Sequence, residues 1–210
     1  MNDFLAFVVK RQDKIIELML QHAEMVLISL AISIVLGLII GYLITYNNKV
    51  AQVVLYIAGI FMTVPSLALF AFLVPILGLN MAPVILGLVI YTQLPIIRNV
   101  YVGLKNIDPT LIDSAKGMGM TSWAINFKVR FPLALPVVFA GIRTATVLGI
   151  GIGAIAAYIG AGGLGVYIFQ GINRGNMNMV MIAAILIALI TVIVDKLLQA
   201  AQNVAEKRIS

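Results

Sequence analysis

The stretch Asp113-Ser114-Ala115-Lys116-Gly117-Met118-Gly119, followed by Val129-Arg130-Phe131-Pro132, is polar and charged in a chain that is otherwise mostly apolar. Hydrophobic residues make up 62% of the 210 residues and charged residues 10%, and the mean hydropathy is +1.09. Soluble domains average roughly 45–50% apolar and about 25% charged residues. The composition therefore predicts an all-α integral membrane protein, whose polar island, residues 105–131, lies outside the hydrocarbon.

Five apolar segments are long enough to cross a bilayer, which takes about 20 helical residues. The charge-free run 50–97 is too long for one span, because as a single helix it would be on the order of 72 Å long. The turn residues Pro75, Gly78, Asn80 and Pro83 predict a reversal near residues 75–82, and Pro65 and Pro95 predict kinks on either side of it. The expected spans are residues 25–48, 53–74, 82–98, 133–158 and 178–199.

Glycines predict close helix contacts and one tight loop. Gly37 and Gly41 lie four residues apart in the first span, a spacing that lets another helix approach closely. Gly149, Gly151 and Gly153 in the fourth span predict the same. The sequence Gly160-x-Gly162-x-x-Gly165 matches a dinucleotide fingerprint, but that motif needs a strand before it. We expect a glycine-rich loop over 160–177 instead.

The two ends of the chain flank one transmembrane domain, residues 23–204. Residues 1–22 carry a helical apolar stripe that is too polar to span, and they predict an interfacial helix on the outer face. His22, the only histidine, is expected on the surface. Residues 205–210 are expected to form a charged cytoplasmic tail. The absence of cysteine excludes disulfides and thiolate sites.

The placement of Lys and Arg predicts the orientation, since these residues are retained on the cytoplasmic side. Nine lie on the side of the polar island and the C-terminus, and four lie on the other side. The polar island and the C-terminus are therefore predicted to be cytoplasmic and the N-terminus outside. The net charge of +6 comes from these loops, so it does not indicate nucleic-acid binding. Arg143 lies in the cytoplasmic half of its expected span, close enough to that end to snorkel or to bond a neighbouring helix.

The polar island predicts a short amphipathic helix. Asp108 is a good N-cap and Pro109 a good first helical residue. Gly117 and Gly119 predict a sharp turn after this helix, and a second short helix is expected over 121–131. Such a helix either caps the bundle or docks into a groove of a soluble partner. One face is apolar and the other carries an i,i+3 ion pair: Leu111, Ile112, Ala115 and Met118 against Asp113 and Lys116.

The spacing Asp113-Ser114-Ala115, then Gly119, then Val129-x-Phe131-Pro132 resembles the E-A-A-x(3)-G-x(9)-I-x-L-P motif of permease subunits of binding-protein-dependent ABC importers. Asp and Ser replace two of the three E-A-A residues, whereas the glycine and the final proline match. Flanking segments resemble the osmoprotectant branch, which imports glycine betaine, carnitine or choline. They are Ile107-Asp108-Pro109, Gly117-Met118-Gly119-Met120-Thr121, Pro132-Leu133-Ala134-Leu135-Pro136, Gly141-Ile142-Arg143-Thr144-Ala145 and Ile159-Gly160-Ala161-Gly162-Gly163-Leu164-Gly165.

The resemblance implies a type I ABC importer permease fold in a bacterial plasma membrane, with about five transmembrane helices in the bilayer. Two permease chains, identical or related, form the channel, two ATPase subunits bind the polar island, and an extracytoplasmic binding protein delivers the substrate. Closure of the ATPases rocks the spans between inward-open and outward-open states. The residues that the resemblance places in the ATPase-coupling helix are Asp113, Ser114, Ala115, Lys116, Gly117 and Gly119.

The chain is expected to carry no catalytic residue, cofactor or metal of its own. It contains no G-x-x-x-x-G-K-[ST] loop to cradle phosphates, so ATP and Mg are expected on the partner ATPase. Two alternatives stay open. One is a permease for methionine or another small solute, and the other is a stand-alone secondary carrier, which would need ionisable groups in mid-membrane. Aromatic faces hold quaternary ammonium groups, but the candidates are scattered and leave the substrate site unknown: Tyr91, Tyr158, Tyr167 and Phe169.

Overall fold

The computed structural model describes residues 2–207, and over these residues it contains helices and turns but no strand. Four helical stretches are long and apolar enough to cross a membrane, and a fifth span is possible if α3 and α4 are counted as one bent span. The elements, in chain order, are α1 (Asn2–Lys10), α2 (Gln12–Leu43), the 3₁₀ turn η1 (Ile44–Tyr46), α3 (Asn48–Thr63), α4 (Ser66–Leu77), α5 (Met81–Lys105), α6 (Pro109–Gly117), α7 (Ser122–Ile125), the π-helical segment η2 (Asn126–Arg130), α8 (Phe131–Gly153), the 3₁₀ turn η3 (Ile155–Ile159), α9 (Gly165–Asn173) and α10 (Met177–Lys207).

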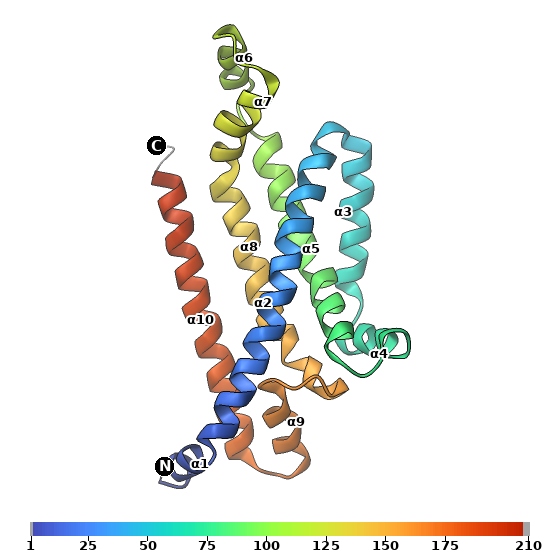
Figure 1. The fold of residues 1–210 in the computed structure, drawn as a ribbon, viewed down its shortest axis with the longest axis vertical. Helices are drawn as coiled ribbons and strands as arrows, with labels where there is room; N and C mark the ends of the chain where they lie inside the picture. The colour runs from blue at the N-terminus through green and yellow to red at the C-terminus, as the bar shows by residue number, and fades with distance from the viewer. Residues whose placement is uncertain (1, 208–210) are drawn as a thin grey trace.

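The long helices α2, α5, α8 and α10 run along the long axis of the molecule (Figure 1). One extremity, here called the α6 end, carries α6 and α7 beyond the ends of the other helices. The opposite extremity, the α9 end, carries α1, α9 and the N-terminus, and α4 lies across the axis in the same half. The helix α10 runs from the α9 end towards the α6 end, so the two ends of the described chain point in opposite directions.

The central helix is α5, which contacts α2, α3, α4 and α8. Its contact with α2 depends on glycine: a Cβ added at Gly37 would lie 2.5 Å from Ile96 Cγ2, and one at Gly41 would lie 2.6 Å from Val100 Cβ. Larger residues would force the two helices apart, since cores tolerate little overpacking. The predicted close approach through these two glycines is confirmed.

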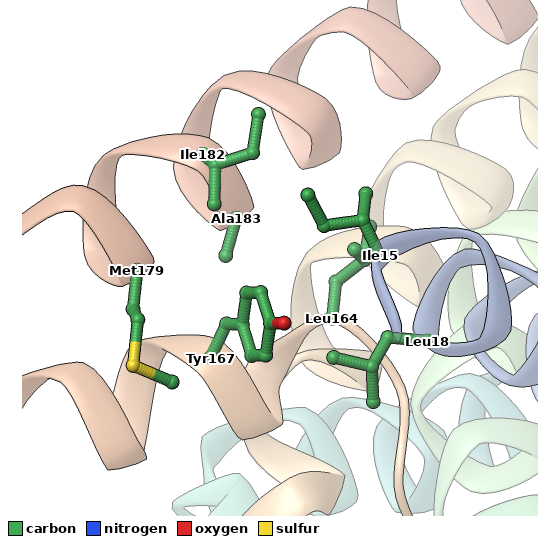
Figure 2. Close-up of a cluster of buried hydrophobic side chains, with 7 residues drawn as sticks. All are labelled: Ile15, Leu18, Leu164, Tyr167, Met179, Ile182 and Ala183. Atoms are coloured by element: carbon green, nitrogen blue, oxygen red, sulfur yellow. The ribbon is translucent and has the colours of Figure 1, made fainter. Parts of the chain in front are cut away.

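The predicted boundary of an interfacial helix at residue 22 is wrong. The first helix ends at Lys10, and α2 begins at Gln12 and continues into the first span without a break. Ile15 and Leu18 are buried in a cluster with side chains from the loop before α9, from α9 and from α10 (Figure 2). The helical apolar stripe therefore packs against the protein.

His22 is buried, with 1% of its surface exposed, so the predicted surface position is also wrong. Its Nε2 lies 3.1 Å from the carbonyl oxygen of Ile150. Because a carbonyl only accepts, Nε2 carries a proton and donates it in this contact. The ring also lies beside Gly153 and Gly163, whose missing side chains leave room for it.

Other helix boundaries also differ from the predicted ones. The second span is divided at Val64-Pro65 into α3 and α4, which meet at 97°. Pro95 lies inside α5 without ending it, and that helix continues to Lys105. The expected loop 160–177 contains the helix α9, and α10 includes residues 205–207 of the expected tail. Residues 208–210 lie outside the described part of the chain.

Candidate functional site

The helix α6 projects from the α6 end and starts as the sequence predicts. Oδ1 of Asp108 accepts a hydrogen bond from the backbone N–H of Thr110 at 2.8 Å, and Pro109 is the first helical residue. This hydrogen bond stabilises the charged carboxylate and lowers the pKa of Asp108. The cap allows a helix of nine residues to persist outside the bundle.

The helix ends in a turn that requires only one of the two predicted glycines. Gly119 has φ +77° and donates its N–H to the Lys116 carbonyl oxygen at 2.9 Å. Gly117 is the last residue of α6 and does not have a positive φ, so the prediction that both glycines turn the chain is wrong for it. A Cβ at either glycine would meet no atom within 4 Å. The backbone here is therefore open to approach from outside.

The predicted apolar face of α6 is divided between the protein and its surroundings. Ala115 is 2% exposed, and Ile112 is half-buried. Leu111 is 48% exposed, and Met118, in the turn after the helix, is 76% exposed. Apolar side chains that a chain leaves exposed beyond its spans are typical of a protein interface.

Charged and polar groups cover the rest of α6. Lys116 Nζ and Asp113 Oδ1 form the predicted i,i+3 pair at 3.0 Å, and both side chains are exposed. Ser114 Oγ donates to the Thr110 carbonyl oxygen at 2.8 Å. Exposed pairs of this kind add little stability, so the charges of α6 are available to set the register of a partner.

Three polar residues connect the region behind α6 to the long helices. Arg130 Nη2 donates to the Leu104 carbonyl oxygen of α5 at 3.2 Å, and Nη1 donates to Asn126 Oδ1 at 3.1 Å. Asn126 Nδ2 in turn donates to Tyr42 Oη of α2 at 3.1 Å. Asn126 and Arg130 are the two ends of η2, and π-helical segments are frequent at functional sites. A displacement of α6 and α7 would reach α2 and α5 through these bonds.

A cavity of about 500 Å³ separates α6 from the ends of α5 and η2. Its walls combine the apolar Ile112 and Ile125 with the charged Lys105, Asp113 and Arg130. The helix α6 is therefore attached through its two connecting segments and is not packed flat against the bundle. This geometry suits a lever better than a cap.

Comparison with known proteins agrees with this geometry. Residues 33–210 match the family of binding-protein-dependent transport system inner membrane components. The chain belongs to this family. The glycine betaine/carnitine/choline transport system permease protein OpuCB of Bacillus subtilis is 36% identical over 94% of this chain and 91% of its own length. The carnitine transport permease protein OpuCB of Listeria monocytogenes is 39% identical over 83% of this chain and 80% of its own length.

Solved structures show the same permease fold. A chain of the methionine ABC transporter MetNI, in an inward facing conformation, matches with a TM-score of 0.77 and 25% identity, over 93% of this permease and 96% of that chain. An amino acid ABC transporter matches with a TM-score of 0.78 at 18% identity, over 95% of this permease and 97% of that chain. The predicted type I ABC importer fold is confirmed.

All six residues of the predicted coupling site lie on α6 or in its C-terminal turn. Five of them are exposed on the permease, whereas Ala115 faces inward. The polar bridge through Tyr42, Asn126 and Arg130 was not predicted. No pattern in the sequence brings these three residues together, because Tyr42 is 84 residues from Asn126.

The permease also contains an ion pair within its spans. Arg143 of α8 donates from Nε to Oδ1 and from Nη2, at 2.8 Å, to Oδ2 of Asp195 of α10. The bond to a neighbouring helix that the sequence predicts for Arg143 is thus confirmed. The side chains of the pair are 31% and 24% exposed, respectively.

Of the four aromatic residues considered for a quaternary ammonium site, the permease brings together only Tyr158 and Phe169. Their ring centroids are 5.4 Å apart in an edge-to-face arrangement. Tyr91 is buried, with its hydroxyl bonded to the Val64 carbonyl oxygen, and Tyr167 is buried in the cluster of Figure 2. Two rings do not make an aromatic cage.

Proposed function

We propose that this chain is the membrane-spanning permease subunit of an ABC importer for quaternary ammonium osmoprotectants, the class that contains glycine betaine, carnitine and choline. The main support is the similarity to curated permeases whose names specify these solutes, at 36–41% identity over most of both chains. The similarity to a methionine transporter is lower, at 25% identity. The permease forms the translocation pathway, and a partner drives transport.

In this proposal α6 is the coupling helix that docks an ATPase subunit. The helix is capped at both ends by its own residues, so it keeps its shape outside the bundle. Leu111 and Met118 supply exposed apolar anchors, and Asp113 and Lys116 supply charges on the same projection. A helix that lays apolar residues into a groove is a common mode of recognition. ATP and Mg are held by that ATPase.

The proposal places the α6 end in the cytoplasm of a bacterial cell and the α9 end outside. Most Lys and Arg residues of the extramembrane segments lie at the α6 end, which is the side where they are retained. An extracytoplasmic binding protein then delivers the substrate at the α9 end, and a second permease chain, identical or related, completes the pathway. This chain itself binds no nucleic acid.

The test is uptake of radiolabelled glycine betaine, carnitine, choline and methionine by matched cells with and without this chain. Loss of quaternary ammonium uptake on deletion, and its return with the intact gene, is the expected result. Loss of methionine uptake instead would make the chain a methionine permease. Uptake by the chain reconstituted alone, without ATP or an ATPase, would make it a stand-alone carrier. Co-purification of an ATPase that hydrolyses ATP in the complex tests the role of α6.

A further inference from the structure

The Arg143–Asp195 pair lies close to the middle of the spans. A Cβ at Gly141, one turn or less from Arg143, would lie 2.8 Å from the Pro95 carbonyl oxygen of α5. The middle residue of α5 is Gln93. Gly37 of α2 lies at the same level as Gln93. The next charged residue after Gly37 in the chain is Lys49, which lies roughly 18 Å further along at about 1.5 Å per residue. The pair is therefore deeper than the sequence pattern predicts.

Lipid is an unfavourable neighbour for such a pair. Charged side chains within a span are costly in hydrocarbon and face a bundle interior or a water-filled cavity. Yet about a quarter to a third of each side chain is uncovered by the rest of the chain. Arg98 of α5 is exposed at nearly the same level. The groups at this depth indicate contact with water or with a polar solute.

A cavity of about 370 Å³ opens beside the pair. Its walls combine the two charged side chains with Ala140, Thr144 and aliphatic residues of α8. Its volume falls in the range of small-molecule sites, which are mostly apolar with a few polar groups that fix orientation. The hydroxyl of Thr144 already donates to the Ala140 carbonyl oxygen, so the remaining side-chain N–H donors of the cavity belong to Arg143.

Both residues of the pair keep hydrogen-bonding groups that the pair itself does not use. A guanidinium has five N–H donors, and Arg143 uses the N–H of Nε and one of the two on Nη2 to bind Asp195. Within residues 2–207, Nη1 of Arg143 donates no hydrogen bond. Each carboxylate oxygen of Asp195 accepts one hydrogen bond and keeps further lone pairs. The surface therefore presents an oriented donor beside a region of negative charge.

We propose that the Arg143–Asp195 pair is a binding site in the translocation pathway for solutes that carry both a carboxylate and a quaternary ammonium group. This inference rests on the proposed function. The solute carboxylate accepts a hydrogen bond from Nη1 of Arg143, and the ammonium, which has no N–H, lies against the carboxylate of Asp195 by charge alone. Glycine betaine and carnitine satisfy both halves of the site. Choline has no carboxylate and satisfies only the Asp195 half.

The test compares uptake of carnitine and choline through the intact importer, with each rate normalised to the amount of chain in the membrane. Arg143→Gln removes the carboxylate donor and should lower the ratio of carnitine to choline uptake about tenfold or more, the loss expected for a charge-assisted hydrogen bond. The double variant Arg143→Gln/Asp195→Asn leaves no unpaired charge, so it covers the case in which the single variant does not insert. It should lower the same ratio. Thr191→Val, on α10 but outside this cavity, removes a hydroxyl that donates to the Ile187 carbonyl oxygen and should leave the ratio unchanged.

Three outcomes would overturn the inference. Equal losses of carnitine and choline uptake in both Arg143 variants would mean that the pair only joins α8 to α10. Unchanged uptake of both solutes would mean that the pair has no role in transport. Wild-type transport of choline but of no zwitterion would reject the site and leave the proposed function in place. Wild-type transport of none of these solutes would reject the proposed function, and the inference with it.

Discussion

The glycines at the two ends of the permease are used in opposite ways. At the α9 end, a Cβ at Gly162 would lie 2.4 Å from Gln21 Oε1, and one at Gly165 would lie 1.8 Å from the Ala154 carbonyl oxygen. At the α6 end, a Cβ at Gly117 or Gly119 would meet nothing within 4 Å. Close packing by the protein's own chain therefore explains Gly162 and Gly165, although Gly160 and Gly175 at the same end are open. At the α6 end the positive φ of Gly119 explains that glycine, and the open surface around Gly117 and Gly119 leaves room for the proposed ATPase partner.

The largest expected effect is on folding at the α9 end. In Gly165→Ala the new Cβ would collide with backbone, which cannot move aside as a flexible side chain can. We expect a loss of about 2 kcal/mol or more in stability, as in overpacked cores. Thermal unfolding of the purified chain in detergent measures it. Gly59→Ala, at a position where the added Cβ meets nothing within 4 Å, is the control and should unfold at nearly the wild-type temperature.

The second effect separates strain from function at two glycines of similar conformation. Gly119 and Gly160 have φ of +77° and +83°, and neither has an atom within 4 Å of an added Cβ. Alanine at either position should cost a similar 1–2 kcal/mol or so of left-handed strain. Uptake should be abolished or nearly so in Gly119→Ala, because the turn after α6 presents the docking surface, and largely kept in Gly160→Ala. Equal uptake by the two variants would remove the special role of the α6 end.

The third comparison uses two exposed ion pairs of equal spacing. Lys116 and Asp113 lie 3.0 Å apart on α6, and Lys14 and Glu17 lie 2.8 Å apart near the α9 end. Asp113→Lys and Glu17→Lys each reverse one charge, and neither should change stability by more than about 0.5 kcal/mol. We expect Asp113→Lys to abolish uptake through loss of ATPase binding, measured by co-purification, and Glu17→Lys to transport normally. The same ATPase yield from both variants would contradict docking through α6.

A smaller effect is expected where the α6 end joins the spans. Asn126→Ala removes the hydrogen bonds that link Arg130 to Tyr42. Each such bond contributes about 1 kcal/mol, so the coupling of α6 to α2 should weaken. The amount of solute transported per ATP hydrolysed should then fall roughly fivefold. ATPase binding should be unchanged, since the docking surface is intact. Tyr42→Phe tests the α2 side of the same bridge and should give a similar loss, whereas an unchanged ratio in both variants would show that the bridge transmits nothing.

The difference between the two ends also shows what could be predicted from sequence. The start of α6, its ion pair and the reversal between α4 and α5 follow from local chemistry, namely an Asp-Pro cap, an i,i+3 spacing and a cluster of turn residues. The α9 end could not be predicted in this way. His22 and Ile15 are buried by residues more than 120 positions away, so their surroundings are tertiary. The 97° bend at Pro65 likewise exceeds what one proline implies, because the residues after it begin a separate helix.

The smallest effect concerns the cap of α6 and its dependence on pH. The hydrogen bond from Thr110 lowers the pKa of Asp108 below its unfolded value, so the folded state favours the carboxylate. The stabilisation is therefore fully present above the ordinary pKa of an aspartate and is lost as the pH falls through the lowered value. Asp108→Asn keeps a capping oxygen that does not titrate, and it should keep ATPase binding while removing this acid-dependent part of the stability. Asp108→Ala should weaken ATPase binding at every pH, because the first turn of α6 then loses its acceptor. If Ala and Asn behave alike, the cap does not hold the shape of α6, and that shape depends instead on the proposed ATPase partner.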